Sequence, residues 1–340
     1  MKVAVAGCGY FSRFHHRAWA RMPDVTLAAT CDRDGAKATA MADSIGIPSA
    51  FDDAAAMLDA VRPDLLDIVA PPPAHLALIR QAAARGIAVI CQKPFCTSLA
   101  EAEQAVAIAE AAGILLVVHE NFRFQPWYAQ VKRLLDSGAL GTPYQLTFRL
   151  RPGDGQGPAA YLDRQPAFQA MPRFLVRETA IHQIDLFRHL FGEPAGIYAS
   201  LQRRNPAISG EDSGFLLFDW ADGRRALFDG NRLADHRARN RRLTMGEVTL
   251  EGSAATLFLD GDAGLWLRPH GGNDAVRVPY AFDDIDFGGD CVFRLQRHVA
   301  DHIRHATPVM NTGHAYLANL RIEAAAYESA RTGTRIALAQ

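Results

Sequence analysis

The sequence predicts an α/β protein with two domains: a doubly wound parallel sheet at residues 1–121, and an α+β domain with a large, mostly antiparallel open sheet at 122–340. In the first part, short apolar segments alternate with amphipathic helical segments, which is typical of parallel strands joined by helices. In the second part, most apolar segments follow one another without an intervening helix, as expected for antiparallel strands. A chain of 340 residues is also long enough for two hydrophobic cores.

The first strand leads into a glycine-rich turn. Gly7 and Gly9 permit a tight turn and a close approach of a pyrophosphate to the backbone, and the helix that follows directs its first N–H groups at the phosphates. Ser12 takes the third position of the pattern, where it is small enough for helix–strand packing and can offer its hydroxyl to a phosphate. The second strand ends at Asp32, where a carboxylate accepts hydrogen bonds from adenosine ribose hydroxyls, so the pattern predicts NAD. Arg33 keeps NADP open as an alternative, because a guanidinium can bind the 2′-phosphate.

The rest of the first domain continues the same alternation. We expect helices at 35–45, 53–61, 75–85 and 98–112, and strands at 65–70, 87–91 and 114–119. Three prolines at 71–73 end one strand abruptly at the carboxyl edge of the sheet, where open α/β sheets bind ligands. The candidate cofactor contacts lie in the first turn or beside such strand ends: Gly7, Gly9, Tyr10, Phe11, Ser12, Asp32, Arg33, Pro71, His75, Gln92, Lys93 and Asn121.

The second domain is predicted to begin with a helix at 127–137. Strands are then expected at 144–150, 196–201, 214–219, 225–229, 242–251 and 255–259, with a long helix at 174–191 and a closing helix at 313–332 that ends in a strand. The segment 151–173 is rich in glycine and proline and has no convincing period. Loops of this length are usually functional, so we expect a substrate lid, with surface decoration as the alternative.

Composition excludes several classes of function. The net charge is -1, which argues against a nucleic-acid partner. The sequence shows neither a signal peptide nor an apolar run of the roughly 18 residues that a membrane span requires, so we expect a cytoplasmic protein without a membrane partner. The five cysteines are odd in number and form no C-x-x-C pair, so we expect neither a disulfide framework nor a thiolate zinc site.

Lys93 is the first candidate for a role in the chemistry. It leaves the strand at 87–91 and precedes Pro94, which stiffens the backbone that presents it. A lysine at this edge of the sheet projects to where the nicotinamide is expected. The alternative is a solvated surface charge.

The long helix of the second domain carries the other candidates. Glu178, His182, Asp185 and His189 are spaced by whole turns of an α-helix and therefore share one stripe. The stripe has three interpretations: a polar face against the lid, a metal site, or a general base with an orienting carboxylate. No second ligand cluster supports a metal. An imidazole has an unperturbed pKa of about 6.5, which suits a general base near neutral pH.

Three motifs together resemble a known family. GCGYFS at the first turn, QKP at 92–94 and the E-x-x-x-H-x-x-D helix that starts at Glu178 are similar to motifs of the glucose–fructose oxidoreductase / inositol 2-dehydrogenase / rhizopine catabolism family. That family has a Rossmann-type NAD(P)-binding domain and usually carries E-K-P and D-x-x-x-H. Gln92 and Glu178 therefore depart from its pattern, which affects the expected substrate preference more than the chemistry.

The resemblance implies hydride transfer between a sugar or polyol and the nicotinamide. It implies that His182 acts as acid and base on the reacting hydroxyl, that Lys93 hydrogen-bonds this oxygen and that Glu178 holds the substrate; whether Lys93 or His182 takes the proton first stays open. The expected substrate-binding residues are Lys93, Arg123, Tyr161, Arg173, Glu178, His182 and Asp185. For Asp185, an anchoring role in the helix is the alternative.

The expected substrate is an aldose that is oxidised at C1 to its lactone, with D-apiose as the specific candidate. The resemblance also implies a homodimer or homotetramer that pairs through the exposed face of the second sheet. Three other functions stay open: a polyol or inositol dehydrogenase, a glycosidase or isomerase that uses NAD transiently, and a non-enzymatic sensor that binds the dinucleotide.

Overall fold

The computed structural model describes residues 1–338, which fall into two compact units. The first unit contains 1–121 and 292–318, and the second contains 122–291 and the chain from Asn319 onward. The expected second domain, 122–340, is therefore interrupted by a segment that returns to the first unit. The reason is specific contact: the Asn311 side chain donates to the Glu120 carbonyl at 2.7 Å, and Val117 forms a β-bridge with Thr312.

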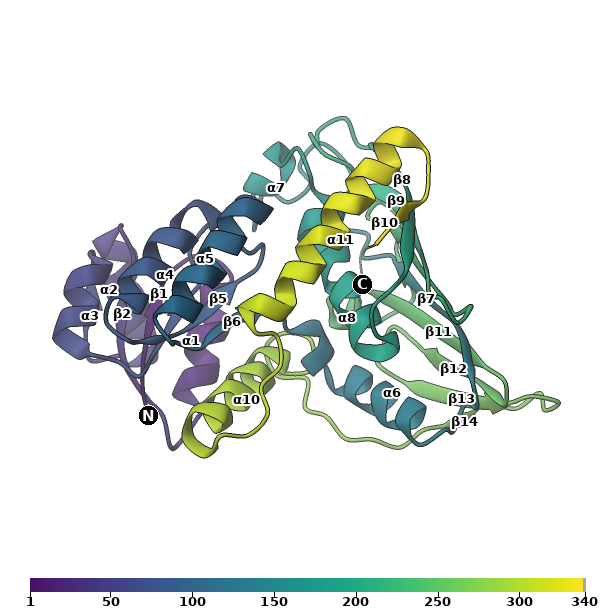
Figure 1. Ribbon diagram of the computed structural model, residues 1–340, viewed down its shortest axis with the longest axis horizontal. Helices are drawn as coiled ribbons and strands as arrows, with labels where there is room; N and C mark the ends of the chain where they lie inside the picture. Colours follow the sequence, from purple (N-terminus) through teal and green to yellow (C-terminus); the bar gives the residue numbers. More distant parts are fainter. Residues whose placement is uncertain (339–340) are drawn as a thin grey trace. The chain divides into compact units, whose positions relative to one another are not determined.

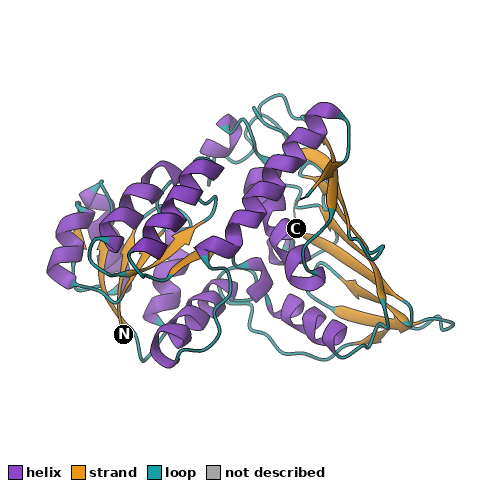
Figure 2. Cartoon of the chain, in the orientation of Figure 1, coloured by secondary structure: helices purple, strands orange, loops and turns teal. Residues whose placement is uncertain are grey.

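The first unit is a doubly wound parallel sheet, as predicted. Its six strands lie in the order β3-β2-β1-β4-β5-β6, and helices flank them (Figure 1; Figure 2). The elements are β1 (Lys2–Ala6), α1 (Ser12–Ala20), β2 (Thr26–Cys31), α2 (Gly35–Ile45), β3 (Ala50–Phe51), α3 (Ala54–Val61), β4 (Leu65–Ile68), η1 (Pro72–Ala74), α4 (His75–Ala83), β5 (Ala88–Gln92), α5 (Leu99–Ala111), β6 (Leu116–His119) and α10 (Cys291–His305).

The centre of this sheet is buried. Every residue of β4 and β6 is buried, which matches the near-continuous apolar strands of sheets that are covered on both faces. Asp67 in β4 is an acidic residue among these apolar strand residues, and its side chain has no exposed surface. A buried carboxylate is costly unless hydrogen bonds satisfy it, and its partners are described below.

The second unit is an α+β domain with a nine-stranded mixed sheet, again as predicted. The strand order is β14-β13-β12-β11-β7-β10-β9-β8-β15. The strands β7 and β10 pair in parallel, and the other neighbours run antiparallel. The elements are η2 (Phe122–Phe124), α6 (Pro126–Asp136), β7 (Pro143–Leu150), α7 (Ala167–Ala170), η3 (Leu175–Ala180), α8 (Ile181–Phe191), β8 (Gly196–Gln202), β9 (Ser213–Asp219), β10 (Arg225–Asn231), α9 (Arg241–Thr244), β11 (Gly246–Gly252), β12 (Ala255–Leu259), β13 (Leu265–Pro269), β14 (Val276–Arg277), α11 (Gly313–Thr332), which begins in the first unit, and β15 (Ile336–Ala337).

One face of the nine-stranded sheet forms the core of the second unit. In β7, Leu146, Phe148 and Leu150 are buried, and the residues between them are more exposed. Helices lie against this face in Figure 2, whereas the opposite face carries no helix within residues 1–338. We call the uncovered side the open face.

Two elements of the second unit differ from the prediction. The expected helix at 174–191 is not uniform: Leu175–Ala180 is π-helical, and the α-helix begins at Ile181. The expected strand at 242–251 begins only at Gly246, because the Asn240 side chain accepts a hydrogen bond from the N–H of Arg242 at 3.1 Å and starts the short helix α9. The strands β13 and β14 of this unit were not predicted, nor were the strand β3 and the helix α10 of the first unit.

Within residues 1–338, the helices are too short or too polar to cross a membrane.

Candidate functional site

The carboxyl edge of the first-unit sheet gathers five predicted residues. Because all of its strands are parallel, their carboxyl ends meet at one edge. Gly7 follows β1 and Asp32 follows β2. Pro71 comes after β4, Lys93 after β5 and Asn121 after β6. The strand order reverses between β1 and β4, which is the position where doubly wound sheets bind ligands.

The two glycines of the first turn have different neighbours. Gly7 has φ +115°, and an added Cβ would lie 2.5 Å from the Val69 carbonyl oxygen, so the protein itself requires glycine there. An added Cβ at Gly9 would meet no atom within 4 Å in the described chain. The open space beside Gly9 is what a pyrophosphate needs to approach the backbone, so the turn fits a dinucleotide.

Ser12 and Asp32 shape this turn. The Ser12 hydroxyl donates to the Gly9 carbonyl at 2.7 Å and is fully buried, which favours a role in the turn over the phosphate contact that we predicted. The Asp32 carboxylate accepts from the N–H of Cys8 at 2.8 Å and from the N–H of Asp34 at 3.0 Å. A half-buried carboxylate fixed in this way is ready to accept ribose hydroxyls. Arg33 beside it is exposed.

Tyr10 and Phe11 complete the turn before α1. Both are half-buried. Their rings meet the ring of Phe14 edge to face, at centroid distances of 6.3 and 5.1 Å. These contacts hold the turn against the first helix.

His75 is buried beneath the loop that Pro71 begins. Its Nε2 lies 2.8 Å from the Ala70 carbonyl, and its Nδ1 accepts from the N–H of Cys96 at 3.3 Å. Burial lowers the pKa of His75 to about 4, so the ring is neutral near neutral pH. Both ring nitrogens therefore serve the protein, which favours a supporting role over the predicted cofactor contact. Pro71 itself is exposed.

Lys93 is half-buried and is held through its backbone. Its N–H donates to the Gln92 side-chain oxygen at 2.7 Å. The Gln92 amide nitrogen lies 3.3 Å from His15 Nε2, so both polar atoms of Gln92 are engaged within the protein. This favours a supporting role for Gln92 over the predicted cofactor contact. The Lys93–Pro94 peptide bond is cis.

Asn121 ends the group of residues in the first unit. Its side chain is 2% exposed, and its Nδ2 has no hydrogen-bond partner within residues 1–338. Buried amide groups normally have partners. An unpartnered donor at this edge of the sheet fits the predicted contact with a bound dinucleotide.

His182 lies in the first turn of α8, directly after the π-helical segment η3. It is 6% exposed, and its ring stacks on the ring of Phe122 with a centroid distance of 3.9 Å and an interplanar angle of 1°. Glu178 lies in η3 and is half-buried. Glu178 lies in a π-helical turn and His182 in an α-helical turn, so the step of four positions between them still covers about one turn, and their shared stripe stays a prediction.

The conformation of η3 is fixed from outside the helix. One carboxylate oxygen of Glu211 accepts from the N–H groups of Phe174 and Val176, each at 3.1 Å, and from the Tyr327 hydroxyl at 2.6 Å. The Glu211 carbonyl also accepts from the N–H of Leu175 at 2.9 Å. These N–H groups start the helix and would otherwise lack partners. The sequence did not single out Glu211, because its position gives no local signal.

Asp185 and Arg123 form a buried ion pair. The Arg123 guanidinium donates to both carboxylate oxygens of Asp185, at 2.8 and 2.6 Å, and Asn319 donates to one of them at 2.8 Å. The Asp185 side chain is 1% exposed. The geometry favours an anchoring role for both Asp185 and Arg123 over the predicted substrate contacts. His189, further along α8, has its pKa lowered to about 4 by burial and by the Arg123 charge.

The segment 151–173 is anchored to the second unit. Tyr161 is 3% exposed and packs with Phe168 and Phe174. Its hydroxyl accepts from Arg232 at 2.7 Å and donates to Asp154 at 3.1 Å. These buried contacts anchor this part of the segment to the second unit and favour a structural role for Tyr161, while the lid stays a prediction.

Arg173 lies at the end of this segment. It is exposed, with its guanidinium 4.5 Å from the centre of the Tyr327 ring. Arg232 is the residue in this region that sequence analysis missed. It is buried and forms an ion pair with Asp154 at 2.8 Å. Arg232 directly follows the strand β10, and the sequence around it contains no motif that indicates a buried arginine.

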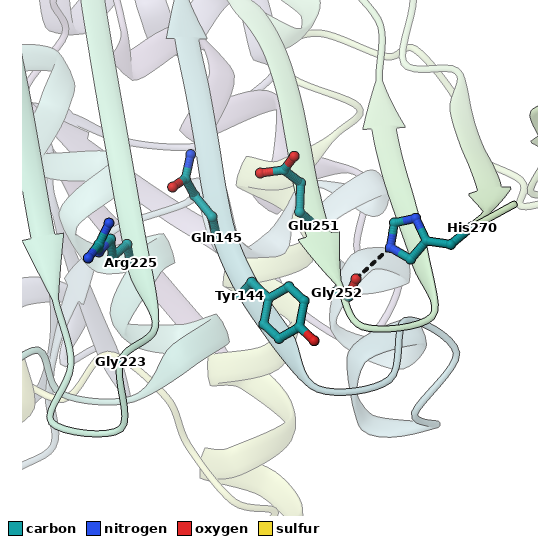
Figure 3. Close-up of a pocket in the computed structure, with 7 residues that line it drawn as sticks. All are labelled: Tyr144, Gln145, Gly223, Arg225, Glu251, Gly252 and His270. Atoms are coloured by element: carbon teal, nitrogen blue, oxygen red, sulfur yellow. Dashed lines mark hydrogen bonds between the residues drawn. The ribbon is translucent and has the colours of Figure 1, made fainter.

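The structure also contains a pocket away from all predicted site residues. Its volume is about 380 Å³, and it lies on the open face of the second sheet. In Figure 3, Gln145, Glu251 and Arg225 project from neighbouring strands, and His270 bonds to the carbonyl of Gly252 at 2.7 Å. No set of three His, Cys, Asp or Glu side chains in residues 1–338 is arranged to hold a metal ion.

The predicted residues thus form two groups. One group lies at the carboxyl edge of the first-unit sheet and includes Gly9, Asp32, Lys93 and Asn121. The other lies on η3 and α8 of the second unit and includes Glu178 and His182. The first group has the geometry of a dinucleotide site. In the second group, the imidazole of His182 lies on the first turn of α8, and Glu178 lies on the π-helical segment directly before it.

Comparison with known proteins identifies both parts of the chain. Residues 1–120 match the family described as "Oxidoreductase family, NAD-binding Rossmann fold", and residues 128–257 match the "GFO/IDH/MocA C-terminal domain". The D-apiose dehydrogenase of Paraburkholderia graminis is 35% identical over 99% of this chain and 89% of its own length. The D-apiose dehydrogenase of Rhizobium rhizogenes is 31% identical over 99% of this chain and 97% of its own length.

A solved structure supports the same assignment. An oxidoreductase from Agrobacterium radiobacter, in complex with NAD+, L-tartaric acid and magnesium, superposes with a TM-score of 0.90 at 30% identity and covers 99% of this chain and 98% of its own. The chain binds NAD through its first unit, as its sequence predicts. It belongs to the Gfo/Idh/MocA family of oxidoreductases.

Proposed function

We propose that this enzyme oxidises a sugar with NAD, most specifically an aldose at C1 to its lactone, with D-apiose as the first candidate. The observation that carries the proposal is Lys93, a lysine at the carboxyl edge of an NAD-binding sheet. The substrate class follows from relatives that are named D-apiose dehydrogenases and match nearly the whole chain. Polyols are the second candidate class, because inositol 2-dehydrogenases also match a large part of the chain.

The proposed roles divide between His182 and Lys93. Bound NAD would accept a hydride, which is the C1–H bond's hydrogen with its electron pair. The hydroxyl proton must leave at the same time so that the C=O bond can form, and we assign His182 as the group that accepts it. Lys93 would donate a hydrogen bond to the same oxygen and stabilise the negative charge that develops there.

Two features of the second unit support the role of His182. The stacked Phe122 ring fixes the plane of the imidazole, and a fixed base loses little entropy on reaction. Glu178 carries a carboxylate in the adjoining η3 segment, and we propose that it binds substrate hydroxyl groups.

The function can be tested by measuring NADH absorbance with a panel of aldoses and polyols, D-apiose among them, with NMR identification of the product. We expect one NADH for each sugar oxidised and a lactone as the first product. Stoichiometric NADH from polyols alone would favour a polyol dehydrogenase. Turnover without net NADH would indicate a glycosidase or isomerase, and tight NAD binding without any turnover would indicate a sensor.

We also propose that the chain forms a homo-oligomer through its open face. Phe215 and Leu217 on β9 are each 38% exposed, and Tyr144 is 54% exposed. Tyr144 is one of the residues that line the pocket (Figure 3). Exposed apolar side chains on one face are typical of an interface. In sedimentation experiments we expect Leu217→Glu to lower the mass, and Leu162→Glu, a change of a 49% exposed residue in the loop at 151–173, to leave it unchanged. An unchanged mass for Leu217→Glu would exclude this face.

A further inference from the structure

A chain of side-chain hydrogen bonds runs from the backbone of Lys93 into the core of the first unit. The N–H of Lys93 donates to Gln92 Oε1 at 2.7 Å, and Gln92 Nε2 lies 3.3 Å from His15 Nε2. On the other side of the His15 ring, Nδ1 lies 2.9 Å from Asp67 Oδ2. His15 and Asp67 have no exposed surface. Three elements supply these residues: β5, α1 and β4.

The direction of every hydrogen bond in this chain is determined by its first link. Because Gln92 Oε1 accepts from a backbone N–H, the other end of the side chain is the NH2 group and must donate. His15 Nε2 is therefore the acceptor, and the ring proton lies on Nδ1, from which it donates to the Asp67 carboxylate. All donors point from Lys93 toward Asp67, an arrangement in which each bond strengthens the next.

The far end of the chain is held by two further donors. Trp19 Nε1 donates to the same Asp67 oxygen at 2.7 Å, and Gln296 Nε2 donates to it at 3.1 Å. Both side chains are fully buried. The carboxylate thus has three fixed partners, from α1 and α10, and its position cannot change without breaking several bonds.

This arrangement of hydrogen bonds requires glutamine at position 92. A carboxylate there would have no proton to donate to His15 Nε2, so the His15 ring would need a second proton to bridge two carboxylates. With Gln92, the ring needs only one proton, and the only formal charge in the chain of bonds is that of Asp67. The departure from the usual E-K-P pattern of the family therefore has a physical consequence inside the first unit.

We propose that Asp67, His15 and Gln92 are positioning residues for Lys93. They fix the backbone from which the Lys93 side chain projects, so that its ammonium group is presented to the substrate oxygen in one orientation. A displacement of a catalytic group by about 1 Å can reduce the rate about a hundredfold. This inference rests on the proposed role of Lys93, but the hydrogen bonds themselves can be measured independently of any activity.

The first experiment measures the hydrogen bonds by NMR. In the full-length wild-type protein, we expect the backbone amide of Lys93 to exchange slowly with solvent and His15 to carry its proton on Nδ1. In Gln92→Met, which keeps the length of the side chain but has no strong acceptor, exchange at Lys93 should become at least about tenfold faster. In Gln92→Glu, exchange at Lys93 should stay slow and His15 should become doubly protonated. A proton on His15 Nε2 in the wild type, or unchanged exchange in Gln92→Met, would overturn the proposal.

The second experiment measures turnover with NAD and the sugar found by the substrate panel. We expect Gln92→Met to lower kcat about tenfold, with the KM for NAD changed less than about twofold, because the variant misplaces Lys93 and leaves the glycine turn intact. Gln92→Glu should recover part of this loss, since it keeps the bond to Lys93. An unchanged kcat in Gln92→Met together with faster amide exchange would disprove the positioning role. If the wild type oxidises no sugar, the proposed function fails, and the NMR experiment still decides whether the chain holds Lys93.

Discussion

The two units hold their proposed catalytic side chains by different means. In the first unit, the Lys93 N–H donates a hydrogen bond to the Gln92 side-chain oxygen, and the N–H of Cys96 in the same segment donates to His75. In the second unit, His182 stacks on Phe122, and its helix is fixed by the ion pair of Arg123 and Asp185. The first unit therefore depends on neutral buried histidines and amides, and the second on a pair of buried charges. The two should respond differently to loss of a charge and to a change in pH.

The largest expected effect is the loss of Arg123. In Arg123→Ala, the Asp185 carboxylate stays buried, loses both hydrogen bonds from the guanidinium and keeps the hydrogen bond from Asn319. Breaking a buried ion pair from one side costs about 3–5 kcal/mol, so the free energy of unfolding of the second unit should fall by that amount. The change can be measured by urea denaturation followed by tryptophan fluorescence.

The matched control for this variant is Arg335→Ala in the same unit. Arg335 also contacts both carboxylate oxygens of an aspartate, Asp219, at 2.7 and 2.6 Å, but the two side chains are 47% and 36% exposed. An exposed ion pair contributes at most about 1 kcal/mol, so the control should lose little stability. If both variants lost the same amount, burial would not be what distinguishes the Arg123 pair.

The next largest effect is the loss of a catalytic group from either unit. Lys93→Ala and His182→Ala should each lower kcat at least about a hundredfold, which is the typical loss of acid–base help and corresponds to about 2.7 kcal/mol in the transition state. NAD affinity, measured by NADH fluorescence, should stay close to that of the wild type. The control is Lys132→Ala, a change of a lysine that pairs with Asp136 within α6. Near-normal turnover of either variant would remove that residue from the mechanism.

The contrast between the units also explains what sequence analysis could and could not predict. The helices Gly35–Ile45 and Gly313–Thr332 and the strand Ala255–Leu259 match their predicted bounds, because their periodicity is a local property of the chain. The glycine turn and Lys93 were also found from local patterns, since both lie directly at strand ends. The π-helical segment was not found, because the Glu211 carboxylate that starts it comes from a distant part of the chain.

The pairing of Arg123 with Asp185 has the same explanation. The sequence showed both residues and suggested a substrate contact for each, but no local pattern reports that two charged side chains from η2 and α8 neutralise one another. The return of 292–318 to the first unit is likewise set by tertiary contacts such as that of Asn311 with Glu120. Tertiary contacts of this kind decide the roles of charged residues, whereas patterning decides where strands and helices occur.

A smaller effect should appear as pH falls, and it should concern the first unit. Burial lowers the pKa of His75 and of His16 to about 4 each, below the value of about 6.5 in an unfolded chain. The unfolded state therefore binds more protons between about pH 6.5 and 4, so stability is fully present above this range and decreases as pH falls through it. For each histidine, the free energy of unfolding should decrease by about 2 kcal/mol as the pH falls from about 7 to about 5.

The variant His75→Gln isolates one of these contributions. An amide can donate to the Ala70 carbonyl and accept from the N–H of Cys96, as the ring does, but it does not titrate. Urea denaturation at a series of pH values should show a shallower loss of stability in the variant than in the wild type. Identical pH dependence in the two proteins would mean that His75 is not held neutral by the fold.

The smallest expected effect on stability is that of Gly9→Ala. Comparing it with Gly7→Ala distinguishes a glycine that the ligand requires from a glycine that the fold requires. An added methyl group at Gly9 meets no atom within 4 Å in residues 1–338, so Gly9→Ala should change the free energy of unfolding by less than about 0.5 kcal/mol. The methyl group would occupy the space that a pyrophosphate needs, so NAD affinity should fall about tenfold. Gly7→Ala is the matched control: its methyl group would lie 2.5 Å from the Val69 carbonyl oxygen at φ +115°, and the strain should cost about 1–3 kcal/mol. Calorimetric titration with NAD and urea denaturation measure the two quantities on the same samples. Unchanged NAD affinity in Gly9→Ala would show that the pyrophosphate does not approach this turn. The methyl group contacts no atom of the described residues outside the turn, so a change in affinity could come only from its contact with the ligand.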